Sequence, residues 1–489
     1  MNQDRRSTGK QETQLRRTAQ RDGIPIQAGQ VVECEIEGLT HEGEGVGRVE
    51  GYALFVPGAL PGERVRAEVV SAGKSYGRGR LIEVIKPGEA RVQPPCPIYD
   101  ACGGCQLQHL DYAAQLRWKR RFVVDSLVRI GKLKVAGKGA GKSDGAVVHP
   151  VIGMDRPWRY RNKAQVAIGA GKAGLIGGFY EQGSHDIVEM DACLIQHKEN
   201  EELVRAVKEA ANLLGISAYD RRTGRGLLRH VVVRHAAATG ERMVVLVTNG
   251  YDIPHVREWI HLIRERAPGV TSICQNVNTS RASVVFGEYT RTLWGEDVIY
   301  DEIAGIRFAI SPRSFFQVNP VQTEVLYRKA VEYAGLTGEE TVIDACCGIG
   351  TITLLMARHA RKVFGVDIVP EAIEDARRNA RINGIRNAEF AVGAAEKVLP
   401  RWKAQGVQPG VIVVDPPRKG CDASLVAAML ELKPRRIVYV SCNPATLARD
   451  LRLLEDGGYR TVEVQPVDMF PHTGHVECVV LMSRVKELT

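Results

Sequence analysis

The stretch from Val342 to Ala357 reads VIDACCGIGTITLLMA and decides the fold of the C-terminal part of the chain. Apolar residues lead into a glycine turn at Gly348 and Gly350, and a helix-forming segment follows. This order is typical of nucleotide-binding α/β folds, because small residues let the backbone wrap an adenosyl group. Thr353 stands where the dinucleotide fingerprint requires its third glycine, so we expect a ligand that has no pyrophosphate.

The neighbouring segments alternate between helix-forming and apolar, strand-like sequence. They are QTEVLYRKAVEYAGL (322–336), KVFGVDI (362–368), EAIEDARRNARING (371–384), VIVVDPP (411–417) and RIVYVSC (436–442). Strict alternation predicts a doubly wound, parallel sheet. Asp367 ends the strand after the glycine turn, where a carboxylate is placed to bond a ribose diol. With the missing third glycine, these features favour S-adenosylmethionine over NAD.

A second strand ends in VIVVDPPRKGCD, residues 411–422. Methyltransferases that attack exocyclic amines carry an aromatic residue after the two prolines, and that residue stacks on the base. Arg418 occupies this position, which argues against amine methylation. We expect Asp415 to lie near the cofactor and the target base; the alternative is an aspartate that only caps a helix.

The next strand ends in IVYVSCNPATLARD, residues 437–450, and places Cys442 at the same sheet edge as Asp415. Carbon-5 of uracil is too poor a nucleophile to take a methyl group from a sulfonium. A thiolate that adds to C6 makes C5 reactive, and a base must then remove the C5 proton. Cys442 is therefore the predicted nucleophile, although its thiol needs activation at neutral pH. The alternative is a buried, inert cysteine.

The rest of the chain suggests three further regions. Residues 1–22 form a basic tail, and residues 23–86 contain short strands cut by glycine and proline, which predict a small β-barrel. Residues 87–310 contain a cysteine-rich loop, a basic amphipathic helix, a Gly/Lys-rich insertion at 135–148 and then antiparallel, strand-like sequence. The predicted fold is thus multidomain α/β, with the doubly wound, Rossmann-like domain at 311–489.

Eleven cysteines in a chain with no export signal indicate a reducing compartment, and we expect a cytoplasmic protein. Cys96, Cys102 and Cys105 have the spacing C-x5-C-x2-C, and Cys193 is a fourth candidate ligand. Such a set predicts a metal site, but the spacing does not separate zinc from an iron–sulfur cluster. Four other cysteines are predicted to be buried core residues without a chemical role: Cys34, Cys274, Cys421 and Cys478.

The net charge and the hydropathy of the chain limit the kinds of partner that it can bind. The net charge of +9 and the pI of about 9.0 are compatible with a nucleic-acid partner. No apolar run reaches the roughly 18 residues of a transmembrane helix, so no membrane association is expected.

The C-terminal motifs resemble the TrmA/RumA family of RNA uracil-5-methyltransferases. The matching segments are SFFQVN (314–319), CCGIGT (346–351), GVDIVPEAIEDA (365–376), VDPPRKG (414–420), VSCNPATLARDL (440–451) and PHTGHVECVVLM (471–482). The resemblance implies that Gln317, Asp367 and Asp415 contact S-adenosylmethionine, that Cys442 is the nucleophile and that Glu477 accepts the C5 proton. Cys346 is a further cofactor-contact candidate, at a position where the family often has an aromatic residue.

The N-terminal half resembles the ribosomal branch of this family. That resemblance implies an RNA-binding TRAM barrel, a [4Fe–4S] cluster on Cys96, Cys102, Cys105 and Cys193, a 23S rRNA substrate and a monomer. Candidate RNA contacts in the central region are Arg159, Tyr160, Arg161, Lys163, Phe179 and His185, each with a structural role as the alternative. Other possible functions are tRNA uracil-5-methylation, a non-catalytic RNA-binding or assembly role, and 5-methylcytosine formation; the last usually needs a second cysteine in a Pro-Cys motif, which DPPR lacks.

Overall fold

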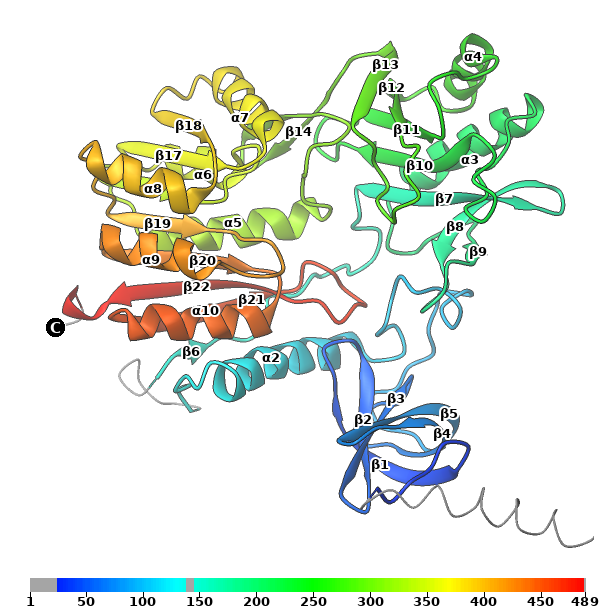
Figure 1. The fold of residues 1–489 in the computed structure, drawn as a ribbon, viewed down its shortest axis with the longest axis horizontal. Helices are drawn as coiled ribbons and strands as arrows, with labels where there is room; N and C mark the ends of the chain where they lie inside the picture. Colours follow the sequence, from blue (N-terminus) through cyan, green and yellow to red (C-terminus); the bar gives the residue numbers. More distant parts are fainter. Residues whose placement is uncertain (1–23, 138–144, 488–489) are drawn as a thin grey trace, which may run out of the picture. The chain divides into compact units, whose positions relative to one another are not determined.

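The computed structural model describes residues 24–137 and 145–487 (Figure 1). The expected basic tail and part of the Gly/Lys-rich insertion lie outside these residues. The chain divides into two compact units. The first contains the barrel up to Pro95 together with Gln106–Trp118 and His472–Gly474, and the second contains Cys96–Cys105, Lys119–Pro471 and the chain from His475 onward. The cysteine loop therefore groups with the second unit, although segments on both sides of it group with the first.

The first unit is built on a closed barrel of five strands in the order β1-β2-β3-β5-β4. Its strands are β1 (Val31–Leu39), β2 (Glu44–Val49), β3 (Tyr52–Pro57), β4 (Arg64–Ala72) and β5 (Tyr76–Lys86). Buried and exposed residues alternate along β1, so one side of the strand faces the barrel core. Gly47 is required there, because an added Cβ would lie 2.7 Å from Cys34 Sγ. The predicted small barrel is confirmed.

The second unit contains a seven-stranded sheet in the order β13-β12-β11-β10-β7-β8-β9. The strands are β7 (Lys163–Gly171), β8 (Gly174–Tyr180), β9 (Ile187–Glu189), β10 (Leu228–His235), β11 (Arg242–Thr248), β12 (Val270–Val277) and β13 (Tyr289–Gly295). Helices α3 (Lys198–Leu213) and α4 (Val256–Arg266) accompany it. The expectation of an antiparallel sheet is wrong for one pair, since β11 and β12 run parallel. Helix α4 lies between them in sequence and provides the crossover that parallel neighbours require.

The same unit contains an eight-stranded sheet in the order β18-β17-β16-β19-β20-β22-β21-β6. Its strands are β16 (Thr341–Asp344), β17 (Lys362–Asp367), β18 (Ala388–Val392), β19 (Val411–Val414), β20 (Arg436–Ser441), β21 (Tyr459–Val467), β22 (Glu477–Arg484) and β6 (Val147–Val148). The first five in this order are parallel, and β22 is inserted antiparallel between β20 and β21. The predicted parallel sheet and the two C-terminal strands are confirmed, whereas β6 was not expected.

Helices cover both faces of this sheet (Figure 1). They are α5 (Pro320–Ala334), α6 (Thr351–Ala357), α7 (Pro370–Ile382), α8 (Ala395–Ala404), α9 (Ala423–Leu432) and α10 (Pro444–Asp456). Val342 packs in the core cluster that includes α5 and α6, whereas the next residue, Ile343, packs in the cluster that includes α8, α9 and α10. The central strands are therefore apolar at every position because both of their faces are buried.

Three elements complete the described chain: helix α2 (Tyr112–Arg129), the hairpin of β14 (Ile299–Ile303) and β15 (Ile306–Ile310), and the 3₁₀ turn η2 (Val485–Glu487). In the described part of the chain, no helix is both long enough and apolar enough to cross a membrane. The strand order reverses between β16 and β19, since β17 lies on one side of β16 and β19 on the other. Open α/β sheets bind their ligands at such a switch point, beyond the carboxyl ends of the strands.

Candidate active site

Three aspartates mark the carboxyl ends of the central strands. Asp344 is the last residue of β16, Asp367 is the last residue of β17, and Asp415 directly follows β19. Because these strands are parallel neighbours, all three residues lie at one edge of the sheet. The structure thus brings the predicted cofactor residues Asp367 and Asp415 to the switch point.

Cys442 and Glu477 join the same edge from two antiparallel strands. Cys442 directly follows β20, and Glu477 is the first residue of β22. The register pairs Ser441 with Cys478, which places Cys442 and Glu477 at adjacent positions of the two strands. Asn443 ends the loop, since its side chain accepts a hydrogen bond from the Ala445 amide at 3.0 Å and caps α10. The Cys-Asn-Pro order therefore holds the thiol between a strand end and a helix start.

The acidic groups of this edge are buried beside one another. Burial raises the pKa of Asp415 to about 7, and the nearby Asp344 carboxylate adds to the effect. Burial and the charge of Asp415 raise the pKa of Glu477 to about 8, against a smaller lowering by Arg418. Glu477 is only 4% exposed. Close acids in a dry site disfavour one another's ionisation, so Glu477 is mostly protonated at neutral pH.

The thiol responds to the same charges. The pKa of Cys442 is raised to about 11, mainly by burial and then by the charges of Glu477 and Asp415. Arg418 acts in the opposite direction. Arg418 is held close, because its carbonyl oxygen accepts hydrogen bonds from Asn443 Nδ2 at 3.3 Å and Thr446 Oγ1 at 3.1 Å. The sequence suggested only that Arg418 replaces a stacking aromatic residue. Its electrostatic effect on the thiol and the glutamate was missed.

The glycine turn leaves room for a ligand next to Asp367. Gly348 and Gly350 have φ of +52° and +87°, and an added Cβ at Gly348 would meet nothing within 4 Å. The two carboxylate oxygens of Asp367 accept the amides of Gly348 at 3.0 Å and Val369 at 2.9 Å. Each oxygen retains a second lone pair. These contacts fix the carboxylate at the turn and leave acceptor capacity for a diol, so the residues fit an adenosyl ligand.

Thr353 explains the departure from the dinucleotide fingerprint. It is buried, and its hydroxyl donates to Asp344 Oδ2 at 2.7 Å. Cys346 donates its amide to the other oxygen of Asp344 at 3.4 Å. Burial raises the pKa of Asp344 to about 6 despite these bonds. Thr353, at the position of the third glycine, is thus hydrogen-bonded to the end of the strand. A glycine at this position would let a pyrophosphate approach.

Gln317 reaches the site together with a residue that the sequence did not indicate. Tyr327 on α5 is buried, and its pKa is raised by burial and by the Asp415 carboxylate, against hydrogen bonding to Thr351 and Gln317. Asn162 Nδ2 donates to the carbonyl oxygen of Gln317 at 3.3 Å. Nothing in the helix pattern of 322–336 distinguishes Tyr327 from a core aromatic residue. Only the strand order shows that α5 borders the cofactor edge.

The four cysteines of the predicted metal site form no disulfide among the described residues and are partly exposed. The pKa of Cys193 is raised to about 11, mainly by burial and then by Cys102 and Cys96, which places these thiols near one another. Cys102 forms a β-bridge with Glu181, and the Gly103 amide donates to the Tyr180 carbonyl oxygen at 3.1 Å. The loop is therefore anchored to the end of β8.

A second group of potential metal ligands lies elsewhere in the described part of the chain. One ligand atom from each of His197, Glu199 and His235 lies within 4.8 Å of the other two, and all three residues are half-buried.

Most of the candidate RNA contacts in the central region have structural roles. Tyr160 is buried, and its hydroxyl donates to the Pro471 carbonyl oxygen at 3.0 Å. Arg159 donates to the carbonyl oxygens of Cys193 and Gln196. Burial and the charges of Arg234 and Arg161 lower the pKa of Lys163 to about 7, with Nζ 5.8 Å from the Phe286 ring centre. Arg161 lies over the Phe470 ring, and Phe179 packs on the central core. His185 lines a pocket on the central sheet.

A doubly wound sheet with an adenosyl-type turn, an acidic edge and an added RNA-binding type of barrel defines a class, the S-adenosylmethionine-dependent RNA methyltransferases. Comparison with family models agrees: residues 302–485 match tRNA (Uracil-5-)-methyltransferase and residues 25–82 match the TRAM domain. An uncharacterized RNA methyltransferase of Halalkalibacterium halodurans is 58% identical over 94% of this chain and 98% of its own. A Bacillus cereus relative is 53% identical over 95% and 98%. The chain belongs to the family of TRAM-containing RNA uracil-5-methyltransferases.

A solved structure supports the fold and the cofactor. The tRNA (uracil-54, C5)-methyltransferase of Pyrococcus abyssi, in complex with S-adenosyl-L-homocysteine, is 30% identical. The match has a TM-score of 0.72 and covers 92% of this chain and 100% of the archaeal chain. S-adenosylmethionine is therefore the methyl donor of this enzyme class.

Proposed function

We propose that this enzyme methylates C5 of a uridine in 23S rRNA through a covalent bond between Cys442 and C6 of the base. The observation that carries the proposal is the pairing of a thiol and a buried carboxyl group at the cofactor edge. Cys442, directly after β20, and Glu477, the first residue of β22, occupy adjacent positions, with Asp415 close enough to shift the pKa of both.

The reaction proceeds in three steps. The Cys442 thiol loses its proton, and Sγ bonds to C6, so the C5–C6 double bond becomes an enolate. C5 takes the methyl group from the sulfonium, which leaves as the neutral thioether S-adenosylhomocysteine. Glu477 then removes the C5 proton, the Sγ–C6 bond breaks, and the C5–C6 double bond is restored. The thiolate returned at the end is available for the next turnover.

The charges at the site explain when the thiol ionises. With the pKa of Cys442 at about 11 and that of Glu477 at about 8, both groups are neutral in the free enzyme near pH 7. A sulfonium cation at this edge favours both anions, and Arg418 adds a second positive charge. Activation of the nucleophile is thereby tied to the presence of the methyl donor.

Covalent trapping tests the two roles separately. Glu477→Gln keeps the shape of the side chain and removes the base, so methyl transfer proceeds but release slows by roughly 10²- to 10⁴-fold. A protein–RNA species that carries labelled methyl and survives a denaturing gel should accumulate. Cys442→Ala should form none. Normal turnover by Glu477→Gln without a trapped species would remove Glu477 from the mechanism and make Asp415 the next candidate.

The nature of the RNA is tested by mapping 5-methyluridine. The TRAM barrel and cysteine loop favour rRNA, but the archaeal tRNA enzyme matches 92% of this chain, so tRNA is the second candidate. Mass spectrometry of rRNA and tRNA from a strain without the protein should show a 5-methyluridine lost from 23S rRNA. The wild-type gene should restore it, and the Cys442→Ala gene should not. Loss confined to tRNA would replace the rRNA assignment.

We also propose that Cys96, Cys102, Cys105 and Cys193 hold a [4Fe–4S] cluster. The local C-x5-C-x2-C spacing, the effect of Cys102 and Cys96 on the pKa of Cys193, and the anchoring of the loop to β8 support this choice. When bound, the cluster supplies a cross-link between the loop 96–105 and the segment at Cys193. Anaerobically purified protein should contain about four iron atoms per chain, and Cys102→Ala should lose them. One zinc and no iron in colourless protein would overturn the assignment.

A further inference from the structure

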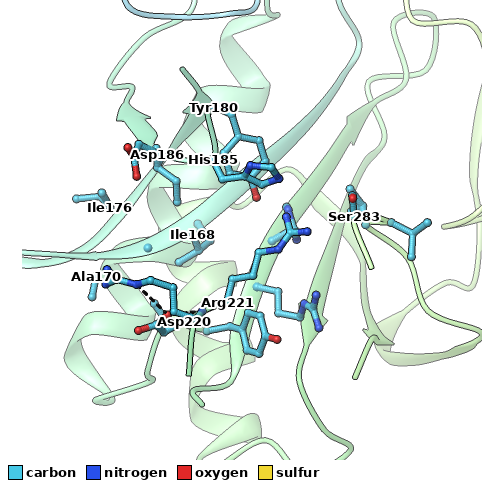
Figure 2. Close-up of a pocket in the computed structure, with 18 of the residues that line it drawn as sticks. Ile168, Ala170, Ile176, Tyr180, His185, Asp186, Asp220, Arg221 and Ser283 are labelled. Atoms are coloured by element: carbon cyan, nitrogen blue, oxygen red, sulfur yellow. Dashed lines mark hydrogen bonds and ion pairs between the residues drawn. The ribbon is translucent and has the colours of Figure 1, made fainter. Parts of the chain in front are cut away.

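A pocket of about 850 Å³ lies on the seven-stranded sheet (Figure 2), and neither Cys442 nor Glu477 is among the residues that line it. Its walls come from β7, from β8 and the turn after it, from the segment 218–222 before β10, and from the loop 282–285 after β12. Its volume is within the range of about 300–1,000 Å³ for small-molecule sites. The mechanism at the methyl-transfer edge makes no use of it.

The pocket is positively charged. Arg221, Arg222 and Arg229 line it, against Asp186 and Asp220. Asp220 is engaged within its own loop, since its carboxylate accepts the Arg222 amide at 2.7 Å. Among the described residues Arg221 has no ion-pair partner, and its charge helps to lower the pKa of Arg229, after the larger effect of burial. Arg222 Nε lies 3.8 Å from Asp220 Oδ1, so the excess positive charge of the pocket comes mainly from Arg221, and this excess favours an anionic ligand.

The buried part of the pocket contains polar groups without partners. Arg229 is 6% exposed and donates from Nη1 to the carbonyl oxygens of Asn278 at 2.7 Å and Ser280 at 2.8 Å. Its Nε is buried and has no hydrogen-bond partner, and the same is true of Nδ1 of His230. Unsatisfied buried donors are uncommon and point to a missing ligand or water.

Aromatic rings provide surfaces for stacking. Figure 2 shows Tyr180 and His185 together on one wall and Ser283 on the opposite wall. The Tyr180 and His185 rings lie 5.6 Å apart and are tilted by 51°. Tyr219 is covered by the Arg229 guanidinium, whose carbon is 4.2 Å from the ring centre. Aromatic and guanidinium planes next to arginines are the usual means of binding an unpaired nucleotide.

We propose that this pocket binds a nucleotide of the substrate RNA other than the target uridine, with its phosphate at Arg221 and Arg222 and its base against Tyr180 and His185. The inference rests on the proposed function, because it assumes an RNA substrate at the methyl-transfer edge. Asp186 and Ser283 offer hydrogen-bond partners for a ribose 2′-hydroxyl, which distinguishes RNA from DNA. The pocket gives the enzyme a second point of attachment that selects single-stranded RNA.

The test compares two double variants of the full chain. Arg221→Ala/Arg222→Ala removes the pocket charge, and Arg205→Ala/Arg257→Ala removes two exposed charges on α3 and α4 as a matched control. Binding is measured by fluorescence anisotropy with a labelled, single-stranded RNA of about twenty nucleotides and with DNA of the same sequence. We expect the pocket variant to weaken RNA binding about tenfold and to reduce the salt slope by about 0.7, the contribution of the one phosphate contact that it loses. The control variant should change both much less.

Tyr180→Ala provides a second, uncharged test and should weaken RNA binding about fivefold or more. Affinity for S-adenosylmethionine, measured by calorimetry, should be unchanged in every variant. Competition with uridine monophosphate tests whether the pocket binds a free nucleotide or a nucleotide within RNA. If millimolar uridine monophosphate displaces RNA from the wild type but not from the variants, the pocket is a site for small nucleotides. If pocket and control variants bind RNA equally, the pocket inference is wrong while the methyl-transfer proposal stands. If the wild type methylates no RNA, the proposed function fails first.

Discussion

Glu477→Gln should change the pH dependence of stability in a direction that the structure determines. The ordinary pKa of a glutamate side chain is 4.5. Burial, and then the charge of Asp415, raise the pKa of Glu477 to about 8. Between these two values the folded protein binds a proton that the unfolded chain releases. Stability therefore falls as the pH rises through this interval, because ionisation increasingly stabilises the unfolded chain while the buried carboxyl group keeps its proton. Glutamine is neutral at every pH and removes this loss.

The size of the effect follows from the shift. Each pKa unit corresponds to about 1.36 kcal/mol, so ionising Glu477 costs the fold at most on the order of 5 kcal/mol above pH 8. Near pH 5 the wild-type carboxyl group is protonated and resembles the amide, so the two proteins should have similar stability. Asp415 and Asp344 have raised pKa values as well, but they are present in both proteins and largely cancel in the difference.

The assay is scanning calorimetry of the full chain at about pH 5 and about pH 8.5. The melting temperature of Glu477→Gln should exceed that of the wild type by at least a few degrees at the higher pH, and by much less at the lower pH. Glu389→Gln is the control, because Glu389 is exposed on β18 and paired with Lys362 at 2.7 Å. A difference between Glu477→Gln and wild type that is the same at both pH values would refute the reasoning.

Three further outcomes are expected. Asp367→Asn should weaken S-adenosylmethionine binding roughly ten- to a hundredfold by calorimetry while RNA binding is retained, as expected for a lost hydrogen bond to a charged group; unchanged cofactor affinity would exclude the diol contact. Lys119→Met should lower the unfolding free energy by about 3–5 kcal/mol, because Lys119 and Asp468 form a fully buried ion pair at 2.6 Å, and Lys119→Met/Asp468→Leu should recover much of it in denaturant unfolding. Binding of S-adenosylmethionine at about pH 7 should release protons from Asp415 and Glu477, seen as a buffer-dependent calorimetric enthalpy, whereas the uncharged S-adenosylhomocysteine should release few.

The sheet was predictable because its signal is local and repeated. The strands β16, β17, β19 and β20 are short apolar runs, each followed by a turn and a helix, and parallel strands necessarily place Asp367, Asp415 and Cys442 at one edge. The strand β18, AEFAV at Ala388–Val392, is partly exposed and contains Glu389, and it was not predicted. The direction of β12 was not predictable in the same way. Its sequence, VTSICQNV, shows no regular alternation that would indicate the strand direction, and the crossover helix α4 allows it to run parallel to β11.

Long-range contacts account for the features that the sequence did not show. Lys119 belongs to a helix that reads as basic and amphipathic, yet its side chain is fully buried against Asp468, a residue far along the chain. The two-residue strand β6 is too short to give a periodic signal, and it pairs with β21 only because the fold brings the two together. Tyr327 is likewise assigned to the site by the order of the strands.

The candidate active-site edge disfavours negative charge on its own acidic groups. Asp344, Asp415 and Glu477 are buried together, and each has a raised pKa because ionisation in this dry space is unfavourable. S-adenosylmethionine is reactive because its sulfur carries a positive charge. In the proposed mechanism the same positive charge stabilises these carboxylates and the Cys442 thiolate, which otherwise have too little counter-charge nearby. After methyl transfer the sulfonium has become a neutral thioether, and that stabilisation is lost. The same change in charge that completes the reaction thus favours reprotonation of the site and release of S-adenosylhomocysteine.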